Sequence, residues 1–333
     1  MAIRPDARAW VEVDLDSLRA NYETVRRAVK PGTALLPMVK ADAYGLGAGR
    51  VVRALEPLEP FGYGVATAGE GAALRALGVR RPVLVVSPLP DGDADTAAEA
   101  RLTASISSME GLDAWVAAAE RVGGDPLEYH VEVDTGMGRC GFDWRETGEW
   151  AEGLRSRLTP EARWTGAFMH FHSADAADPR PSAVQWERFH DALVQLPVSR
   201  EDLVVHAANS AAALRFPEYR ADAVRPGIFL YGGAPAPGAE GSAPWSSTGG
   251  HVHLTDLTSA PVTGSTGRRS SRRSPRRSPS RPTGRRGSTS GTAARKWVGR
   301  PLMHVIGRVG RPGQWFAHGS ADGGTSRSPS DVS

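Results

Sequence analysis

The chain has 333 residues, and its hydrophobic content of 40% suffices for one large barrel and excludes a chain that is disordered throughout. Its net charge of +3 arises in one segment, because residues 267–300 hold eleven Arg, one Lys and no acidic residue, so nucleic-acid binding would have to reside there. A single cysteine, Cys140, excludes an internal disulfide, and the lack of any run of about 20 apolar residues or of an apolar leader predicts a cytoplasmic protein with no membrane partner.

Short apolar runs recur between residues 34 and 232 at the spacing of βα units. Eight of them are expected to be strands: 34–40, 62–67, 82–88, 103–108, 128–134, 165–171, 203–209 and 224–232. Amphipathic helices are expected between them, with apolar faces formed by Leu18, Tyr22, Val25 and Val29 and by Val184, Phe189, Leu193 and Leu196. The pattern predicts an α/β fold, a (β/α)₈ TIM-type barrel over residues 8–235, although an open doubly wound sheet has a similar pattern. A ninth run, 10–15, is surplus and is expected to pair outside the barrel.

The first predicted strand ends at Lys40, one of only three lysines in a chain with 37 arginines. An amine that must lose its proton to form an imine cannot be replaced by a guanidinium, so Lys40 is interpreted as a Schiff-base lysine. The alternative is a strand-end lysine that reaches into solvent. Tyr44, one helical turn away, could offer its hydroxyl to a phosphate or could simply pack.

The fifth predicted strand runs into "VDTGMGRCGF", residues 133–142. The glycines on either side of Met137 permit a backbone that aims Arg139 inward, although an ordinary glycine-rich turn is the alternative. Cys140 could have its pKa lowered by Arg139, or it could be a small core thiol.

Strand alternation predicts that His170 and His172 share a face, and His206 on the seventh strand could complete a metal site. Metal-dependent barrel hydrolases carry such a histidine pair near the first strand and a lysine midway, which is the reverse of the order in this chain. No metal site is therefore predicted.

The ends of the last two predicted strands suggest a phosphate site. Ser210 follows strand seven at an expected helix start, and Gly227 and Ile228 lie near the exit of strand eight. Barrels commonly bind phosphate with these two loops. A phosphate site and a candidate amine at one barrel mouth indicate pyridoxal phosphate.

Residues 236–333 differ in composition from the rest of the chain. A Pro/Gly/Ala linker is followed by a low-complexity basic Ser/Arg/Pro-rich segment with few apolar residues, and this tail is expected to be largely disordered.

Five segments in the same order resemble the successive motifs of alanine racemase, a fold-type III pyridoxal-phosphate enzyme. They are "VKADAYGLGAGRVVRAL", "VEVDTGMGRCGF", "MHFHSADAAD", "HAANSAAAL" and "AVRPGIFLYG". The resemblance spans residues 8–235 and implies interconversion of L-alanine and D-alanine, which supplies peptidoglycan precursors, by a homodimer.

The resemblance also implies roles for individual residues. Lys40 would hold the cofactor as an imine and act as the base for the D-enantiomer, and Arg225 would face the pyridine nitrogen. Arg139 would contact the phenolic oxygen, and His170 would lie against the ring. The remaining implied cofactor-binding residues are Tyr44, Asn209, Ser210, Gly227 and Ile228.

The chain departs from the family after residue 231. Racemisation requires a base on each face of the planar intermediate, and the family takes the second base, a tyrosine, from a C-terminal β domain of the partner subunit. This chain has no tyrosine after Tyr231, and the β domain's strand pattern is missing from its last 102 residues. We hypothesise an out-of-frame reading of a GC-rich gene that begins near residues 236–260. The alternatives are a basic nucleic-acid-binding appendage and, for the whole protein, a non-catalytic pyridoxal-phosphate homeostasis barrel.

Overall fold

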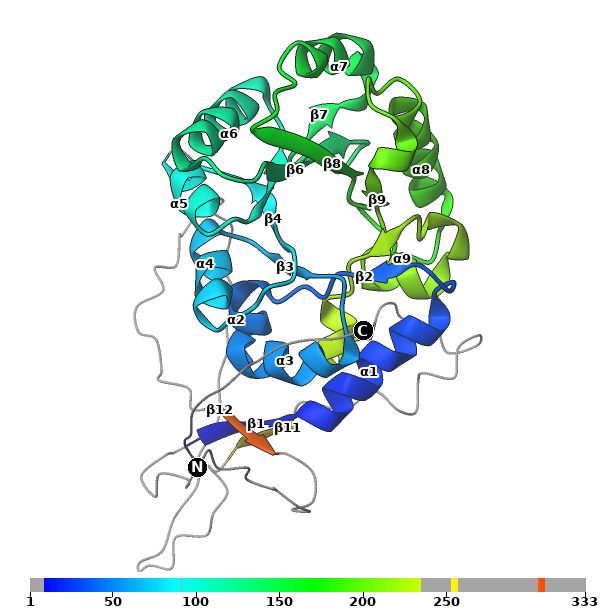
Figure 1. Ribbon diagram of the computed structural model, residues 1–333. Helices are drawn as coiled ribbons and strands as arrows, with labels where there is room; N and C mark the ends of the chain where they lie inside the picture. The colour runs from blue at the N-terminus through cyan, green and yellow to red at the C-terminus, as the bar shows by residue number, and fades with distance from the viewer. Residues whose placement is uncertain (1–8, 91, 235–252, 257–304, 309–333) are drawn as a thin grey trace, which may run out of the picture.

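The computed structural model of the protein describes residues 9–90, 92–234, 253–256 and 305–308. Eight parallel strands form a curled sheet with helices around its outside (Figure 1). In spatial order they are β2 (Ala34–Leu35), β10 (Ala223–Val224), β9 (Val204–His206), β8 (Ala162–Phe168), β6 (Leu127–Asp134), β5 (Thr103–Ile106), β4 (Val83–Pro88) and β3 (Tyr63–Val65). A short strand, β7 (Phe142–Asp143), pairs with β6.

The sheet closes on itself next to β2. Met38 forms a parallel bridge with Gly64, and the N–H of Val39 donates to the carbonyl of Gly64 at 2.8 Å. In return, the N–H of Gly64 donates to the carbonyl of Pro37 at 2.9 Å. The predicted (β/α)₈ barrel is confirmed, and the open doubly wound sheet is excluded.

The helices lie between consecutive strands, as the βα spacing predicts. They are α1 (Leu15–Ala28), α2 (Lys40–Tyr44), α3 (Ala48–Leu55), α4 (Ala68–Ala76), α5 (Asp93–Glu99), α6 (Met109–Val122), α7 (Thr147–Arg155), α8 (Arg180–Leu193) and α9 (Ser210–Arg215). Single 3₁₀ turns are η1 (Glu56–Leu58), η2 (Trp144–Glu146), η3 (Arg200–Asp202), η4 (Pro217–Tyr219) and η5 (Ile228–Tyr231).

Local sequence explains the best-formed helices. The carboxylate of Asp14 caps α1 by accepting from the N–H groups of Asp16 and Ser17, and the predicted apolar face from Leu18 to Val29 is buried. Ser108 caps α6, whose buried residues Leu112, Trp115, Ala118 and Ala119 follow the helical repeat.

The expected apolar face of α8 is wrong at Val184, whose side chain is 41% exposed. Ser182, Gln185, Phe189 and Ala192 face inward instead. The helix is rotated because the amide of Gln185 hydrogen-bonds to the loops after β6 and β8.

The first and last barrel strands are shorter than the predicted runs 34–40 and 224–232. Pro37 and Pro226 have no N–H to donate to the ladder, although their carbonyls accept from the N–H groups of Gly64 and Met38, both at 2.9 Å. The strand predicted at 165–171 likewise ends at Phe168, before both His170 and His172.

The ninth extended run forms β1 (Ala9–Asp14), and its expected pairing outside the barrel is confirmed. It lies antiparallel to β11 (His253–Asp256) and parallel to β12 (Val305–Arg308). Apart from these two strands, the tail predicted to be disordered lies outside the described residues. Among the helices of the described part, none is long and apolar enough to cross a membrane.

Candidate active site

A cavity of about 470 Å³ lies at the carboxyl ends of the barrel strands. All nine residues that the sequence suggested for the site line it: Lys40, Tyr44, Arg139, His170, Asn209, Ser210, Arg225, Gly227 and Ile228. They come from the first, fifth, sixth, seventh and eighth barrel strands or the loops that follow them. The barrel therefore brings together residues up to 188 positions apart.

The chain after Lys40 adopts a left-handed turn. Ala41, Asp42, Ala43 and Tyr44 have φ between 52° and 56°. Tyr44 follows Lys40 by one turn of helix, as expected, but this turn is left-handed and not the ordinary right-handed one. Non-glycine residues avoid this region because Cβ crowds the following carbonyl. The turn is stabilised by hydrogen bonds, among them the N–H of Ala43 to the carbonyl of Val39 at 2.8 Å and the N–H of Gly45 to that of Ala41 at 2.8 Å.

This strain gives a testable expectation for Ala41, whose side chain is exposed. Ala41→Gly removes the Cβ penalty and should raise the free energy of unfolding by about 1 kcal/mol. The matched control is Ala114→Gly at an exposed position of the right-handed helix α6, which should lower it by about 1 kcal/mol. Urea denaturation of both variants checks this, and destabilisation by both would contradict the left-handed turn.

The amine of Lys40 lies in surroundings that favour its neutral form. Burial lowers its pKa, the cations Arg139 and Arg225 lower it further, and Glu70 opposes them. A lysine with a lowered pKa is a better nucleophile at neutral pH.

A polar cradle lies where the loops after β9 and β10 meet. The hydroxyl of Ser210 accepts from the N–H of Gly227 at 2.8 Å and from the N–H of Phe229 at 3.3 Å. A Cβ at Gly227 would lie 2.4 Å from the hydroxyl oxygen of Tyr44, so only glycine admits that hydroxyl beside the loop. Asn209 caps α9 through its side-chain oxygen, and Ile228 lies at the rim, 49% exposed.

The ring of Tyr44 is held in this place by a second tyrosine. Its centroid lies 4.7 Å from that of Tyr231, and the hydroxyl of Tyr231 donates to the carbonyl of Met38 at 2.8 Å. Burial raises the pKa of both phenols, so both are protonated at neutral pH and can donate hydrogen bonds.

Arg225 is buried and rigidly hydrogen-bonded. Its guanidinium donates to the carbonyls of Met169 and His206, both at 2.8 Å, and to that of Ala207 at 3.2 Å. Burial lowers its pKa to about 10, with Glu132 opposing the shift. Arg225 therefore stays protonated at neutral pH.

Two buried histidines continue from Arg225 into the barrel. Nδ1 of His206 accepts from Arg225 at 2.6 Å, so its Nε2 carries the proton and donates to Nδ1 of His130 at 2.8 Å. Burial and the charge of Arg225 lower the pKa of His130 to about 3 and that of His206 well below 6.5. Both rings are neutral at pH 7, and they orient Arg225 without adding charge.

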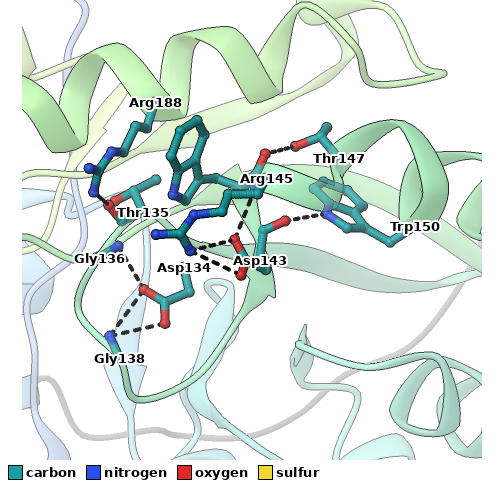
Figure 2. Close-up of polar contacts among 10 residues, drawn as sticks. Asp134, Thr135, Gly136, Gly138, Asp143, Arg145, Thr147, Trp150 and Arg188 are labelled. Carbon is teal, nitrogen blue, oxygen red and sulfur yellow. Dashed lines mark hydrogen bonds and ion pairs between the residues drawn. The ribbon is translucent and has the colours of Figure 1, made fainter.

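The loop that carries Arg139 is shaped by Asp134 (Figure 2). Its carboxylate accepts from the N–H of Gly136 at 2.8 Å and from the N–H of Gly138 at 3.0 and 3.1 Å. Arg188 donates to the carbonyl of Thr135 at 2.9 Å and stacks over the ring of Trp144. These contacts fix the conformation of the loop. The side chain of Arg139, which belongs to this loop, lines the cavity.

Cys140, next to Arg139, is half-buried. Burial raises the pKa of its thiol, Glu132 raises it further, and Arg139 opposes both. The surroundings therefore favour the neutral thiol.

His170 and His172 both line the cavity, although they follow β8 rather than alternate along it. Burial lowers the pKa of His170 to about 3, with the cations Arg225, Arg139 and Lys40 acting in the same direction. His206 is engaged with Arg225 and does not join them. In the part of the chain that the structure describes, no three His, Cys, Asp or Glu side chains are grouped to hold a metal ion.

Glu132 is a cavity residue that the sequence interpretation missed. It is 3% exposed, and burial raises its pKa while Arg225 and Arg139 lower it. Its signal was present: in "EYHVEVD" the polar His130, Glu132 and Asp134 alternate with apolar residues, which predicts one polar face. Glu132 therefore interacts electrostatically with both arginines of the cavity.

Comparison with known proteins agrees with this geometry. The family described as "Alanine racemase, N-terminal domain" matches residues 13–235. The chain is 36% identical to the alanine racemase of a Nostoc species over 69% of its length, and 37% identical to that of Geobacillus stearothermophilus over 71%. It spans 60% of the length of each of these relatives.

Solved structures show the same relationship. Alanine racemase from Streptomyces lavendulae superposes with a TM-score of 0.65 at 33% identity, covering 70% of this chain and 61% of that one. The enzyme from Bartonella henselae, solved with covalently bound pyridoxal phosphate, gives 0.62 at 26% identity, covering 69% and 62%. The chain belongs to the alanine racemase family, and its barrel corresponds to the N-terminal domain of that family.

Proposed function

We propose that the barrel binds pyridoxal phosphate through Lys40 and moves the α-proton of alanine, the reaction that supplies D-alanine to peptidoglycan precursors. One observation supports this more than any other. A lysine with a lowered pKa lines the same cavity as a cradle made by Ser210, Gly227 and Tyr44.

The residues present fit this cofactor. The missing Cβ of Gly227 leaves room for the Tyr44 hydroxyl, and that hydroxyl and the Ser210 side chain would hold the phosphate. Arg139 and Arg225 give the cavity positive charge that suits a dianion, and Glu132 and Asp175 are the acidic side chains that line it.

The charged residues of the cavity would have distinct roles in the reaction. When bound, the cofactor supplies an electron-accepting ring that stabilises negative charge at the substrate Cα. Lys40 would hold the cofactor's aldehyde carbon and move the α-proton on one face of the substrate. Arg225, protonated at neutral pH, would keep the ring nitrogen unprotonated and so limit charge delocalisation, while Arg139 would contact the phenolic oxygen.

The opposite face of the substrate needs a second base for full racemisation. The chain has no tyrosine after Tyr231, and the six present include Tyr44 and Tyr231, whose rings contact each other at a tilt. We therefore propose that this chain exchanges the α-proton of D-alanine at the Lys40 face but turns L-alanine into D-alanine very slowly.

Proton exchange in deuterated water tests the proposal. The chain loaded with pyridoxal phosphate should incorporate deuterium at Cα of D-alanine, followed by NMR, with little net racemisation and slow exchange of L-alanine. Borohydride should fix the cofactor to a peptide that contains Lys40. Cofactor binding without exchange of either enantiomer would favour a non-catalytic pyridoxal-phosphate-binding protein, and no cofactor attachment would contradict both functions.

A further inference from the structure

Glu70 at the start of α4 makes contacts that its local sequence does not require. "TAGE", residues 67–70, has the pattern of a capping box, in which the glutamate would accept from the N–H of the threonine. Half of that motif is present, since the N–H of Glu70 donates to the hydroxyl of Thr67 at 3.2 Å. The carboxylate instead accepts from the N–H of Ala41 at 2.7 Å and from the N–H of Ala66 at 2.8 Å.

These two amides belong to the segment of Lys40 and to the end of β3. The backbones of the two segments are hydrogen-bonded to each other up to Val39 and Gly64. Beyond that point the left-handed turn of residues 41–44 carries the chain away, and direct backbone pairing ends. The carboxylate of Glu70 bridges the amides two residues beyond Val39 and Gly64, those of Ala41 and Ala66, and so continues the connection between the two segments.

We propose that Glu70 is a positioning residue for Lys40: its carboxylate ties the first amide after Lys40 to the end of β3 and so holds the lysine at the cavity. The strained turn explains why the hydrogen bonds from Glu70 are needed. A run of four left-handed residues persists only where neighbouring groups hold it. The proposal uses the proposed function only in taking Lys40 as the reactive amine.

The charges around Lys40 allow the effect of Glu70 to be measured through the pKa of the lysine. The groups that act on its amine are Arg139 after β6, Arg225 after β10 and Glu70 on α4, and His170 after β8 is neutral. Both arginines lower the pKa of Lys40, and Glu70 raises it. Removing the carboxylate's charge while the turn stays in place should therefore lower the pKa of Lys40 further, whereas release of the lysine into solvent would raise it.

The experiment uses the full chain without cofactor. Reductive ¹³C-methylation labels its three lysines, Lys30, Lys40 and Lys296, and NMR follows each resonance with pH; Lys40→Arg assigns the signal. In Glu70→Gln the pKa of Lys40 should fall by roughly half a unit, about threefold in the protonation equilibrium. Glu70→Asp, which keeps the charge but is one methylene short, should give a value between the two and covers the case in which the glutamine variant does not fold.

Two controls separate positioning from stability. Thr67→Ala removes the helix cap but leaves the carboxylate, so it should lower the melting temperature without shifting the pKa of Lys40. Glu120→Gln, at an exposed site on α6, should change neither. Pyridoxal-phosphate attachment should weaken roughly tenfold in Glu70→Gln, the loss expected for one charge-assisted hydrogen bond, and in neither control.

An unchanged pKa of Lys40 in a folded Glu70→Gln chain would overturn the proposal, whereas a raised pKa would show that losing the tie releases the lysine into solvent, as the proposal requires. Failure of the unaltered chain to bind pyridoxal phosphate would count against the proposed function alone, because the titration of Lys40 needs no cofactor.

Discussion

Replacing Lys40 with alanine should abolish attachment of pyridoxal phosphate and reduce α-proton exchange of D-alanine by about 1,000-fold or more. The variant loses both the amine that holds the aldehyde carbon and the base that moves the proton. Lys40→Arg should be equally inactive, because a guanidinium keeps its proton at neutral pH. The absorption of the bound cofactor and deuterium incorporation at Cα measure the two losses.

The chain offers a matched control in Lys30, an exposed lysine two residues after the end of α1. Lys30→Ala should leave cofactor attachment and exchange unchanged. Melting curves of both variants test whether the loss is chemical. Lys40→Ala should not lower the melting temperature as much as a core mutation does, because the Lys40 side chain is only half-buried. Exchange that persists in a folded Lys40→Ala chain would show that another group carries the proton.

Acidification should destabilise the barrel strongly between pH 6.5 and about 3. His130 and His170 have their pKa values lowered from 6.5 to about 3, and that of His206 lies well below 6.5. In this range the unfolded chain binds protons that the folded chain does not. The free energy of unfolding therefore falls as pH falls, by about 1.4 kcal/mol per pH unit for each such histidine, and the contribution is complete above pH 6.5.

Glu132 acts in the opposite sense over part of this range, because its folded pKa is raised and its protonation stabilises the buried side chain. Its single contribution is smaller than that of three histidines. The net expectation is thus a loss of stability on acidification.

Guanidinium denaturation at a series of pH values measures this slope. His130→Gln keeps a hydrogen-bond acceptor for His206 and should reduce the slope by about one proton, or about 1.4 kcal/mol per pH unit. His190→Gln on the exposed side of α8 is the control and should leave the slope unchanged. A free energy of unfolding that is constant between pH 6.5 and 4 would contradict neutral buried histidines.

Much of the barrel could be predicted from the sequence because its signals are local. The cap of Asp14 on α1 and the spacing of Leu112, Trp115 and Ala119 on α6 need only a few neighbouring residues. The site could be assembled in outline for a related reason. In a parallel barrel every strand ends at the same rim, so residues after several strands must lie close together whatever the details.

The parts that sequence reasoning missed depend on partners far along the chain. Gln185 turns inward because it bonds to Thr135, 50 residues away, and Glu70 leaves its expected cap for Ala41, 29 residues away. Nothing in "ADAY" favours four left-handed residues, so that turn needs the closed barrel around it.

By itself, the sequence of this protein determined the order of strands and helices, the place of Lys40 at a strand exit and the family to which the barrel belongs, because periodicity, caps and motifs act over short distances. Only the tertiary structure decided the hand of the turn after Lys40, the neutrality of His130 and His206 and the electrostatic interaction of Glu132 with Arg225. Those properties arise from burial and from contacts between distant segments, and they exist only when the barrel is closed.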